Sequence, residues 1–401
     1  MGKIFVLIFG ILFLLIGGIY LFLFYAYPKT PTTTAVHYFI DSFTNPHLKL
    51  DKQVIGFLPY WDTDDIPSIE LNSLSEVNYF SLSPNGDGEI IKVTGNETHP
   101  GWREWDTQEM KDFITQAHII GTDVSLTILS HDADVIESIL ASEQAQETLI
   151  DELIDQVKTR QLDAINIDFE YLGNPPAGYQ GKFILFSHKL SRAFTEQVPD
   201  ATLSISVMPR DARETDGLLN SKQLQPFYDR FIVMSYDYYG SNADIAGPVA
   251  PMKGFKEEKY FFDVETTYAD YKKIIPTKKL IMGVPYYGWD RAVEAGTKIN
   301  SLTFAADDPN NYAAVISYSR MRESENLTEC KWDDIAQERW CWYTDPQTNI
   351  DHQVWVADNK SIGIRFDYAN KQDFAGIAIW ALGYDKGYND LWEMIRHKFT
   401  H

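Results

Sequence analysis

Residues 162–171, with the sequence LDAINIDFEY, constrain the fold more than any other part of the chain. Polar side chains occupy the even positions Asn166, Asp168 and Glu170, and large apolar side chains occupy the odd positions between them. Successive side chains of a strand point to opposite faces, so this pattern predicts a strand with one polar and one apolar face. The apolar face suits a covering layer of helices, and the polar face suits a functional interior. An edge strand with its polar face in water is the alternative interpretation, which Asn-x-Asp-x-Glu fits less well.

Seven other short apolar runs have the length and composition of strands, and helical patterns lie between them. The expected strands are residues 54–59, 76–82, 124–129, 203–207, 231–236, 280–285 and 374–382. The clearest helical patterns cover residues 106–120, 142–159 and 183–194, with Gly121 and Ser142 as caps. Together with the strand before Glu170 these runs make eight strands that alternate with helices. The sequence therefore predicts an α/β fold of the (β/α)8 TIM-barrel type.

Length and net charge bear on the size of the fold and on the kind of partner. A chain of 401 residues with 44% hydrophobic residues can bury the core of a single large barrel. The formal net charge of −22 excludes nucleic acid as a partner, because phosphate binding requires a basic surface.

The expected barrel gathers several polar and aromatic residues at one rim. In such barrels the chemistry lies at the C-terminal ends of the strands. Glu170, Tyr236, Asp237, Tyr286 and Trp380 all lie at or just after the ends of expected strands. Four separate stretches of the sequence therefore contribute to one candidate site.

These stretches resemble the motifs of glycoside hydrolase family 18, the chitinase-type family. Asp163, Asn166, Asp168 and Glu170 are similar to its DxxDxDxE motif, with Asn166 where most chitinases have Asp. The same departure occurs in the peptidoglycan and spore-cortex branch of the family. The sequence MSYD at 234–237 resembles M-x-Y-D, GVPYYG at 283–288 resembles G-x-P-x-Y-G, and GIAIW at 376–380 resembles the eighth strand.

The resemblance covers about residue 53 to the C-terminus and implies a role for each motif residue. It implies that Glu170 is the general acid, that Asp168 holds the substrate's acetamide N–H, and that Tyr236 donates to the acetamide oxygen. Asp237 would help to hold the acetamido group, and Trp380 would form the floor of the sugar site. The same motifs place Met234, Tyr286 and Asn166 among the substrate-binding residues.

The family's chemistry implies retaining, substrate-assisted hydrolysis of β-1,4 bonds next to N-acetylglucosamine, without a cofactor. A cell-envelope glycan of the peptidoglycan type is the favoured substrate, and chitin oligosaccharides are the alternative. Two other function classes stay open: a sugar-binding lectin on the same fold, and a membrane-tethered scaffold. The presence of Glu170 argues against the lectin, and the intact rim argues against the scaffold.

Residues 289–372, between the last two strands, are too many for a simple loop and indicate a small α+β insertion. Both cysteines of the chain, Cys330 and Cys341, fall inside it and can form one disulfide if the domain is exported. They lack the further Cys or His of a zinc site, so no metal is expected. His131, after the third strand, is interpreted as a polar loop residue.

The N-terminus contains an apolar run long enough to span a bilayer. We expect residues 1–27 to be an uncleaved transmembrane anchor, with a cleaved signal peptide as the alternative. Residues 28–52 are expected to form a stalk, and residues 53–401 the folded domain. The catalytic domain would then lie outside the cytoplasm, either membrane-anchored or secreted.

Overall fold

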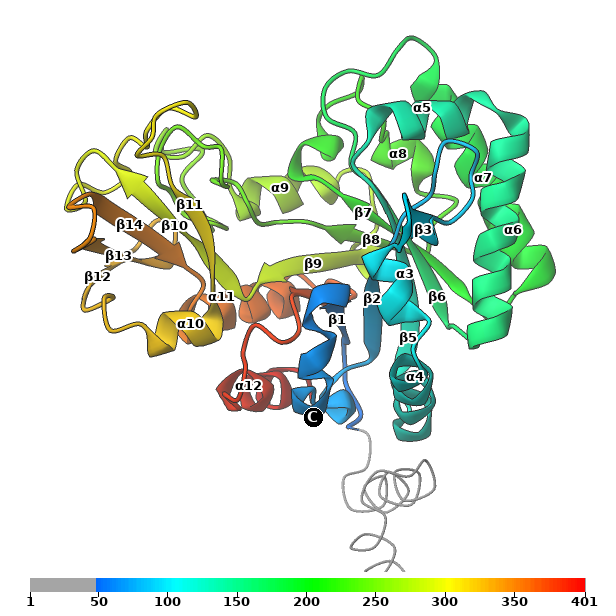
Figure 1. Cartoon of the computed structure of the whole chain (residues 1–401), viewed down its shortest axis with the longest axis horizontal. Helices are drawn as coiled ribbons and strands as arrows, with labels where there is room; N and C mark the ends of the chain where they lie inside the picture. The colour runs from blue at the N-terminus through cyan, green and yellow to red at the C-terminus, as the bar shows by residue number, and fades with distance from the viewer. Residues whose placement is uncertain (1–47, 401) are drawn as a thin grey trace, which may run out of the picture.

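Eight parallel strands close into a barrel in the computed structural model, which describes residues 48–400 (Figure 1). The order around the barrel is β1-β15-β9-β8-β7-β6-β5-β2. The strands are β1 (Gln53–Pro59), β2 (Glu76–Leu82), β5 (Asp123–Ser130), β6 (Ala164–Phe169), β7 (Thr202–Val207), β8 (Arg230–Val233), β9 (Leu280–Pro285) and β15 (Gly376–Trp380). The eight-stranded barrel expected from the sequence is confirmed, although β8 ends at Val233, three residues earlier than expected.

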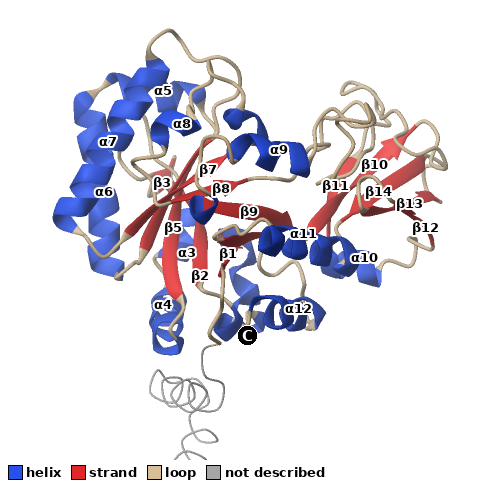
Figure 2. Cartoon of the chain, turned by 180° about the vertical axis from the view of Figure 1, so that it is seen from behind, coloured by secondary structure: helices blue, strands red, loops and turns tan. Residues whose placement is uncertain are grey.

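Helices cover the outside of the barrel (Figure 2). They are α3 (Pro100–Trp105), α4 (Gln108–Ile120), α5 (Ala133–Ala141), α6 (Glu143–Arg160), α7 (Tyr179–Gln197), α8 (Ser221–Leu224), α9 (Val264–Tyr271), α11 (Asn359–Lys371) and α12 (Asp390–Phe399). The caps follow the sequence: the Ser142 hydroxyl accepts from the backbone N–H of Ala145, and Gly121 ends α4 in the left-handed conformation. Short 3-10 turns, η1 (Tyr60–Ser68), η2 (Leu71–Ser73), η3 (Pro209–Ala212) and η4 (Thr277–Lys279), and the β3–β4 hairpin (Val93–Thr94, Glu97–Thr98) complete the barrel layer.

The alternation in β6 sorts its side chains as its sequence predicts. Ile165, Ile167 and Phe169 are each at most 1% exposed, and the Phe169 ring lies 6.1 and 6.4 Å from the rings of Phe183 and Phe186 in α7. The intervening polar side chains point into the barrel, where they are also buried. The helix layer thus covers the apolar face, and the polar face belongs to the barrel interior.

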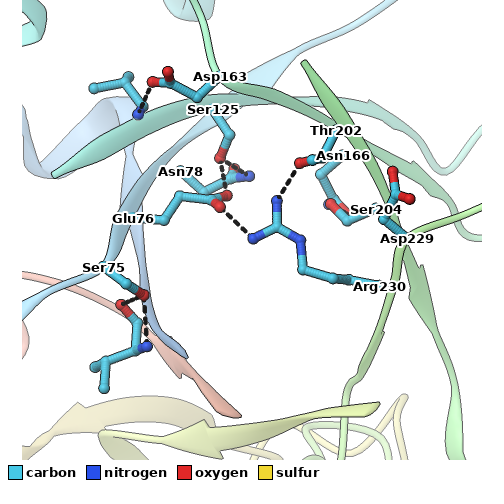
Figure 3. Close-up of polar contacts among 12 residues, drawn as sticks. Ser75, Glu76, Asn78, Ser125, Asp163, Asn166, Thr202, Ser204, Asp229 and Arg230 are labelled. Atoms are coloured by element: carbon cyan, nitrogen blue, oxygen red, sulfur yellow. Dashed lines mark hydrogen bonds and ion pairs between the residues drawn. The ribbon is translucent and has the colours of Figure 1, made fainter. Parts of the chain in front are cut away.

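Polar side chains of β2, β5, β6, β7 and β8 lie together inside the barrel (Figure 3). The Asn78 amide donates to Ser125 Oγ at 2.7 Å, and Ser125 Oγ donates to Glu76 Oε1 at 2.5 Å. Arg230 contacts the other oxygen of Glu76 and also donates to Thr202 Oγ1 at 2.9 Å. Buried polar groups are costly unless they are hydrogen-bonded, so this network fixes the rotamers beneath the rim.

Another part of the interior is apolar. Ile55, Phe57, Phe80, Ile232 and Ile281 form a separate buried cluster. Trp380 packs on it from above, because its ring lies 4.6 Å from that of Phe80. Trp380 therefore lies at the C-terminal end of the barrel, whereas Glu76, Thr202 and Arg230 begin their strands and lie at the opposite end.

The insertion is a five-stranded antiparallel sheet beside the barrel (Figure 1). Its strand order is β11 (Ala313–Ser317), β10 (Tyr287–Val293), β14 (Asp351–Val356), β13 (Glu338–Thr344) and β12 (Glu329–Asp333), with α10 (Tyr318–Glu323) after β11. Cys330 and Cys341 face each other across β12 and β13 and form the expected disulfide, with a Cα–Cα distance of 4.0 Å. The sheet ends at Val356. The expected range 289–372 therefore includes α11, which packs on β9 and β15 and belongs to the barrel.

The two ends of the described chain lie together. Leu50 pairs with Thr400, and the backbone N–H of Asp51 donates to the Phe399 carbonyl at 2.8 Å. The predicted membrane segment 1–27 and most of the predicted stalk 28–52 lie outside the described residues. Within residues 48–400, every helix is too short or too polar to cross a membrane.

Candidate active site

A cavity of about 760 Å³ opens at the C-terminal ends of the barrel strands. Six of the residues predicted from the sequence line it: Asp168, Glu170, Met234, Tyr236, Asp237 and Trp380. They come from β6, β15 and the segment after β8, so the closure of the barrel brings together residues more than 200 positions apart. We refer to this cavity as the cleft.

Asp168 is the innermost carboxyl group of the cleft. It lies near the end of β6 and is 3% exposed. Burial raises the pKa of Asp168 well above its ordinary value, the nearby Glu170 raises it further, and a hydrogen bond from Ser206 opposes the rise. Its Oδ1 atom is buried and has no hydrogen-bond partner among the described residues. A buried acceptor of this kind is suited to a donor that a ligand supplies.

Glu170 follows the last residue of β6 and keeps the strand's direction, because its N–H donates to the Ser130 carbonyl at 2.9 Å. Burial raises the pKa of Glu170, His131 and Arg210 lower it, and Asp237 raises it. The charge of Glu170 disfavours a charge on Asp168, because two negative charges at close range repel each other. Of the two carboxyl groups with a raised pKa, Glu170 is the more accessible from the cleft.

His131 is nearer to the chemistry than its interpretation as a polar loop residue implied. Its Nδ1 lies 3.6 Å from Glu170 Oε2, and its side chain is 60% exposed. The sequence places it directly after Ser130, the last residue of β5, and that position at a strand end was the signal available for finding it.

The segment after β8 turns so that Tyr236 and Asp237 face the cleft. Ser235 Oγ donates to the Gly283 carbonyl at 2.8 Å, and Asp237 adopts a left-handed conformation with φ 54°. Asp237 Oδ1 then accepts from the Trp289 indole at 2.8 Å. Burial raises the pKa of Tyr236 well above its ordinary value, so its hydroxyl stays a donor.

Aromatic rings form one side of the cleft. The Trp380 ring lies 5.9 Å from that of Phe57 and 6.4 Å from that of Trp61. Trp61, in η1, is 51% exposed and was not predicted from the sequence. Exposed rings beside a cavity offer flat apolar surfaces on which sugar rings can stack.

Two predicted substrate-binding residues, Asn166 and Tyr286, do not lie in the cleft. Asn166 is fully buried inside the barrel, where its amide donates to Ser206 Oγ at 2.9 Å and to Thr127 Oγ1 at 3.1 Å. Tyr286 is 1% exposed and lies near Asp385, outside the barrel interior. The next tyrosine instead contacts residues that line the cleft.

Tyr287 is that residue, and it occupies the tyrosine position of the G-x-P-x-Y-G pattern. It forms a hydrogen bond with the carboxylate of Asp237. Its ring centroid lies 6.2 Å from that of Tyr236. The pattern itself could have identified it, because Tyr286 occupies a variable position of the motif.

Comparison with known proteins assigns the family. The model of "Glycosyl hydrolases family 18" matches residues 53–385, which contain all the residues of the cleft. The chain belongs to glycosyl hydrolase family 18. It is accordingly a glycoside hydrolase, and the predicted family resemblance is confirmed.

The chain is similar to a cortical fragment-lytic enzyme and to a di-N-acetylchitobiase. The chain is 22% identical to the cortical fragment-lytic enzyme of Bacillus anthracis, over 87% of this chain and 76% of that protein. It is 24% identical to the di-N-acetylchitobiase of Mus musculus, over 57% of this chain and 62% of that protein. The match thus spans less than two thirds of the chitobiase.

Solved family 18 structures share the fold. The Group IV chitinase of Ostrinia furnacalis, in complex with allosamidin, superposes with a TM-score of 0.72 at 17% identity, covering 86% of this chain and 98% of that one. The spore cortex-lytic enzyme SleL of Bacillus megaterium superposes with a TM-score of 0.66 at 17% identity, covering 87% of this chain and 74% of that one.

Proposed function

We propose that the protein hydrolyses β-1,4 bonds next to N-acetylglucosamine in a cell-envelope glycan of the peptidoglycan type. The observation that carries this proposal is the convergence of three groups in one cleft. Glu170 is an acid with a raised pKa, Asp168 has an unpartnered buried oxygen, and Tyr236 has a hydroxyl that stays protonated. These three groups are sufficient for a substrate-assisted mechanism.

The proposed mechanism uses the substrate's own acetamide as the nucleophile. Glu170 donates its proton to the leaving oxygen while the acetamide carbonyl oxygen attacks the anomeric carbon, forming an oxazolinium ion. Asp168 accepts the acetamide N–H and offsets the positive charge, and Tyr236 donates to the acetamide oxygen and fixes its position. Water then attacks the anomeric carbon, and Glu170 takes back a proton. The configuration at that carbon is retained.

The favoured substrate rests on sequence similarity and on one residue. The match to a cortical fragment-lytic enzyme extends over 87% of this chain, and Asn166 replaces the aspartate found in most chitinases. The similarity to a di-N-acetylchitobiase supports chitin oligosaccharides as the second candidate. A non-catalytic lectin is a weaker candidate, because Glu170 is present in the cleft.

A substrate panel tests the function. The soluble domain is incubated with peptidoglycan glycan strands and with chitin oligosaccharides, and the products are identified by mass spectrometry. Cleavage next to N-acetylglucosamine with retained configuration is expected, faster on the peptidoglycan strands. Binding without cleavage of either glycan would favour the lectin. A glycan without the acetyl group at the cleaved sugar should bind and stay intact, and its cleavage at the normal rate would overturn substrate assistance.

We also propose that residues 1–27 hold the catalytic domain outside the cytoplasm. The Cys330–Cys341 disulfide supports export, because disulfides persist in oxidising compartments. N-terminal sequencing of the mature protein tests the anchor. A mature chain that begins beyond Ala26 would instead indicate a secreted enzyme.

A further inference from the structure

Two guanidinium groups, those of Arg210 and Arg213, line the cleft, and only Arg213 is in close contact with a carboxylate. Arg213 contacts Asp270, whose side chain is 9% exposed. It also lies over the rings of Phe255 and Phe262, at 5.1 and 4.7 Å. Arg213 is therefore part of the structure of the cleft wall.

Arg210 has a different environment. It lies in η3 after β7, and its Nη2 donates to the Tyr171 carbonyl at 3.1 Å. Tyr171 is the residue after Glu170, so this hydrogen bond holds the guanidinium beside the proposed acid. The charge of Arg210 also reaches Glu170, since it lowers the pKa of that carboxyl. A sugar that presents its glycosidic oxygen to Glu170 would lie next to Arg210.

The carboxylates around Arg210 bind it loosely. Glu214 Oε2 lies 3.7 Å from Arg210 Nε and is on a side chain that is 49% exposed, and Asp211 Oδ1 lies 4.0 Å away. The pair with Glu214 is exposed and long, so it contributes little free energy and a ligand can replace Glu214 at small cost. The Arg210 side chain is itself 38% exposed and accessible from the cleft.

The positive charge of Arg210 lies among many negative charges. The chain carries a formal charge of −22, and the cleft also contains Glu170, Asp237 and Glu214. A neutral glycan experiences no repulsion from these groups, whereas a glycan with carboxylates does. A guanidinium offsets that repulsion and matches the two oxygens of a carboxylate.

We propose that Arg210 binds a carboxylate on the substituent of the sugar next to the scissile bond, and that it gives the enzyme a preference for anionic glycans. Muramic acid, whose 3-O-lactyl group carries such a carboxylate, has the required chemistry. This inference rests on the proposed function, because it assigns a specificity residue to the same cleft.

Matched substrates test the charge without a mutation. One muramic-acid-containing oligosaccharide is prepared as the free acid, as its methyl ester, and with an alanyl residue that moves the carboxylate outward. The wild-type enzyme should have a kcat/KM about 10- to 100-fold higher for the free acid or for the alanyl form than for the ester, the range expected for a charge-assisted hydrogen bond. Whichever acidic form is preferred locates the carboxylate on the lactyl group or on the peptide.

Variants of Arg210 and Glu214 should change the preference for the acid over the ester in opposite directions. Arg210→Gln should bring the ratio of the acid to the ester close to one, and Arg210→Lys should retain part of it. Glu214→Gln removes the competing carboxylate and should increase the ratio. Arg192→Gln is the matched control, because Arg192 lies on α7 with a side chain 71% exposed and pairs with Glu196. Its ratio should equal that of the wild type.

The outcomes separate the two proposals. If wild-type enzyme cleaves acid and ester at equal rates, or if Arg210→Gln lowers both equally, the role of Arg210 is refuted while hydrolysis stands. If the wild-type enzyme cleaves none of the glycans, the proposed function itself fails. A ratio that falls in Arg210→Gln and rises in Glu214→Gln supports the inference, and circular dichroism of each variant checks that it is folded.

Discussion

Glu170 and Asp168 are two residues apart, but their environments suit them to different tasks. Asp168 lies inside the barrel with Ser206, 3% exposed, and is shielded from the solvent. The Glu170 side chain is 24% exposed and lies near the ring of His131 and the guanidinium of Arg210. Glu170 is therefore the one open to the cleft, while Asp168 is enclosed. These different surroundings suit the proposed roles of Glu170 as acid and Asp168 as stabiliser.

Replacement of Glu170 by Gln should abolish hydrolysis and leave glycan binding close to that of the wild type. The amide keeps the shape of the side chain but cannot deliver a proton, and general acid catalysis contributes about 100- to 10,000-fold. Steady-state kinetics give kcat, and calorimetry gives Kd. Glu147→Gln, on the exposed face of α6, is the control. Turnover of Glu170→Gln at the wild-type rate would disprove the assignment of the acid.

Replacement of His131 by Asn should extend activity to higher pH. The general acid works only while it is protonated, and a protonated His131 lowers the pKa of Glu170. Without that cation the pKa of Glu170 rises, so the alkaline limb of the kcat/KM profile moves upward. Asp237 and Arg210, the other charged groups near Glu170, are unchanged in this variant. His397→Asn on α12 is the control. An alkaline limb that stays in place, or that moves to lower pH, would show that His131 does not tune the acid.

At the scale of elements, the alternation of polar and apolar residues predicts where strands occur. Contacts with neighbouring segments determine where each strand ends. Apolar alternation was sufficient to identify β6 and its polar interior face, because burial acts on every second residue. The end of β8 was predicted too late, because the bond from Ser235 to Gly283 and the left-handed Asp237 both depend on the neighbouring segments. The same limit applies to Tyr286 and Tyr287: which of them contacts the residues of the cleft depends on the path of the chain from β9 to β10. Sequence motifs identify a segment more reliably than the direction of its side chains.

Gly283→Ala should impair the cleft while leaving the rest of the barrel folded. A Cβ atom at this position would lie 2.5 Å from the Val233 carbonyl oxygen and 2.9 Å from Tyr236 Cε1. β9 must move away from β8 or Tyr236 must turn, at a cost of about 1–3 kcal/mol in the free energy of unfolding. We expect a lower Tm and a lower kcat. Gly181→Ala in α7, where a Cβ would meet nothing within 4 Å, is the matched control. Equal stability and kcat in the two variants would contradict this account of Tyr236.

At the scale of the whole molecule, acidity is the dominant property. Most of the carboxylates behind the charge of −22 are at the surface, where they keep the protein soluble and repel one another. A few carboxyl groups are buried instead. Burial raises the pKa of Asp211 to about 7, and that of Asp385 to about 6. Composition gives the net charge, but it cannot reveal which carboxyl groups lie in the core, because this depends on the packing of the loops around the barrel.

The folded state should lose stability as the pH rises from 4 to 8. Both buried groups have a pKa above the ordinary aspartate value of 3.8, so the folded chain retains protons that the unfolded chain releases. The stability that these two groups contribute is fully present below about pH 4. It is lost as the pH rises through about 6 for Asp385 and about 7 for Asp211. For Asp211 alone the free energy of unfolding changes by about 4 kcal/mol, since the pKa rises from 3.8 to about 7 and one pKa unit corresponds to about 1.4 kcal/mol. Denaturant unfolding across this pH range at about 0.3 M salt, which screens surface repulsion, measures it.

Asp211→Asn separates the buried group from the surface charge. The amide can still accept the hydrogen bond that the backbone N–H of Met208 donates to Asp211, at 2.7 Å, but it does not titrate. The variant should therefore lose less stability than the wild type between pH 4 and 8. Asp307→Asn, at an exposed position, changes the net charge equally and should follow the wild-type curve. If both variants flatten the curve to the same extent, surface repulsion accounts for the pH dependence and the buried carboxyl group does not.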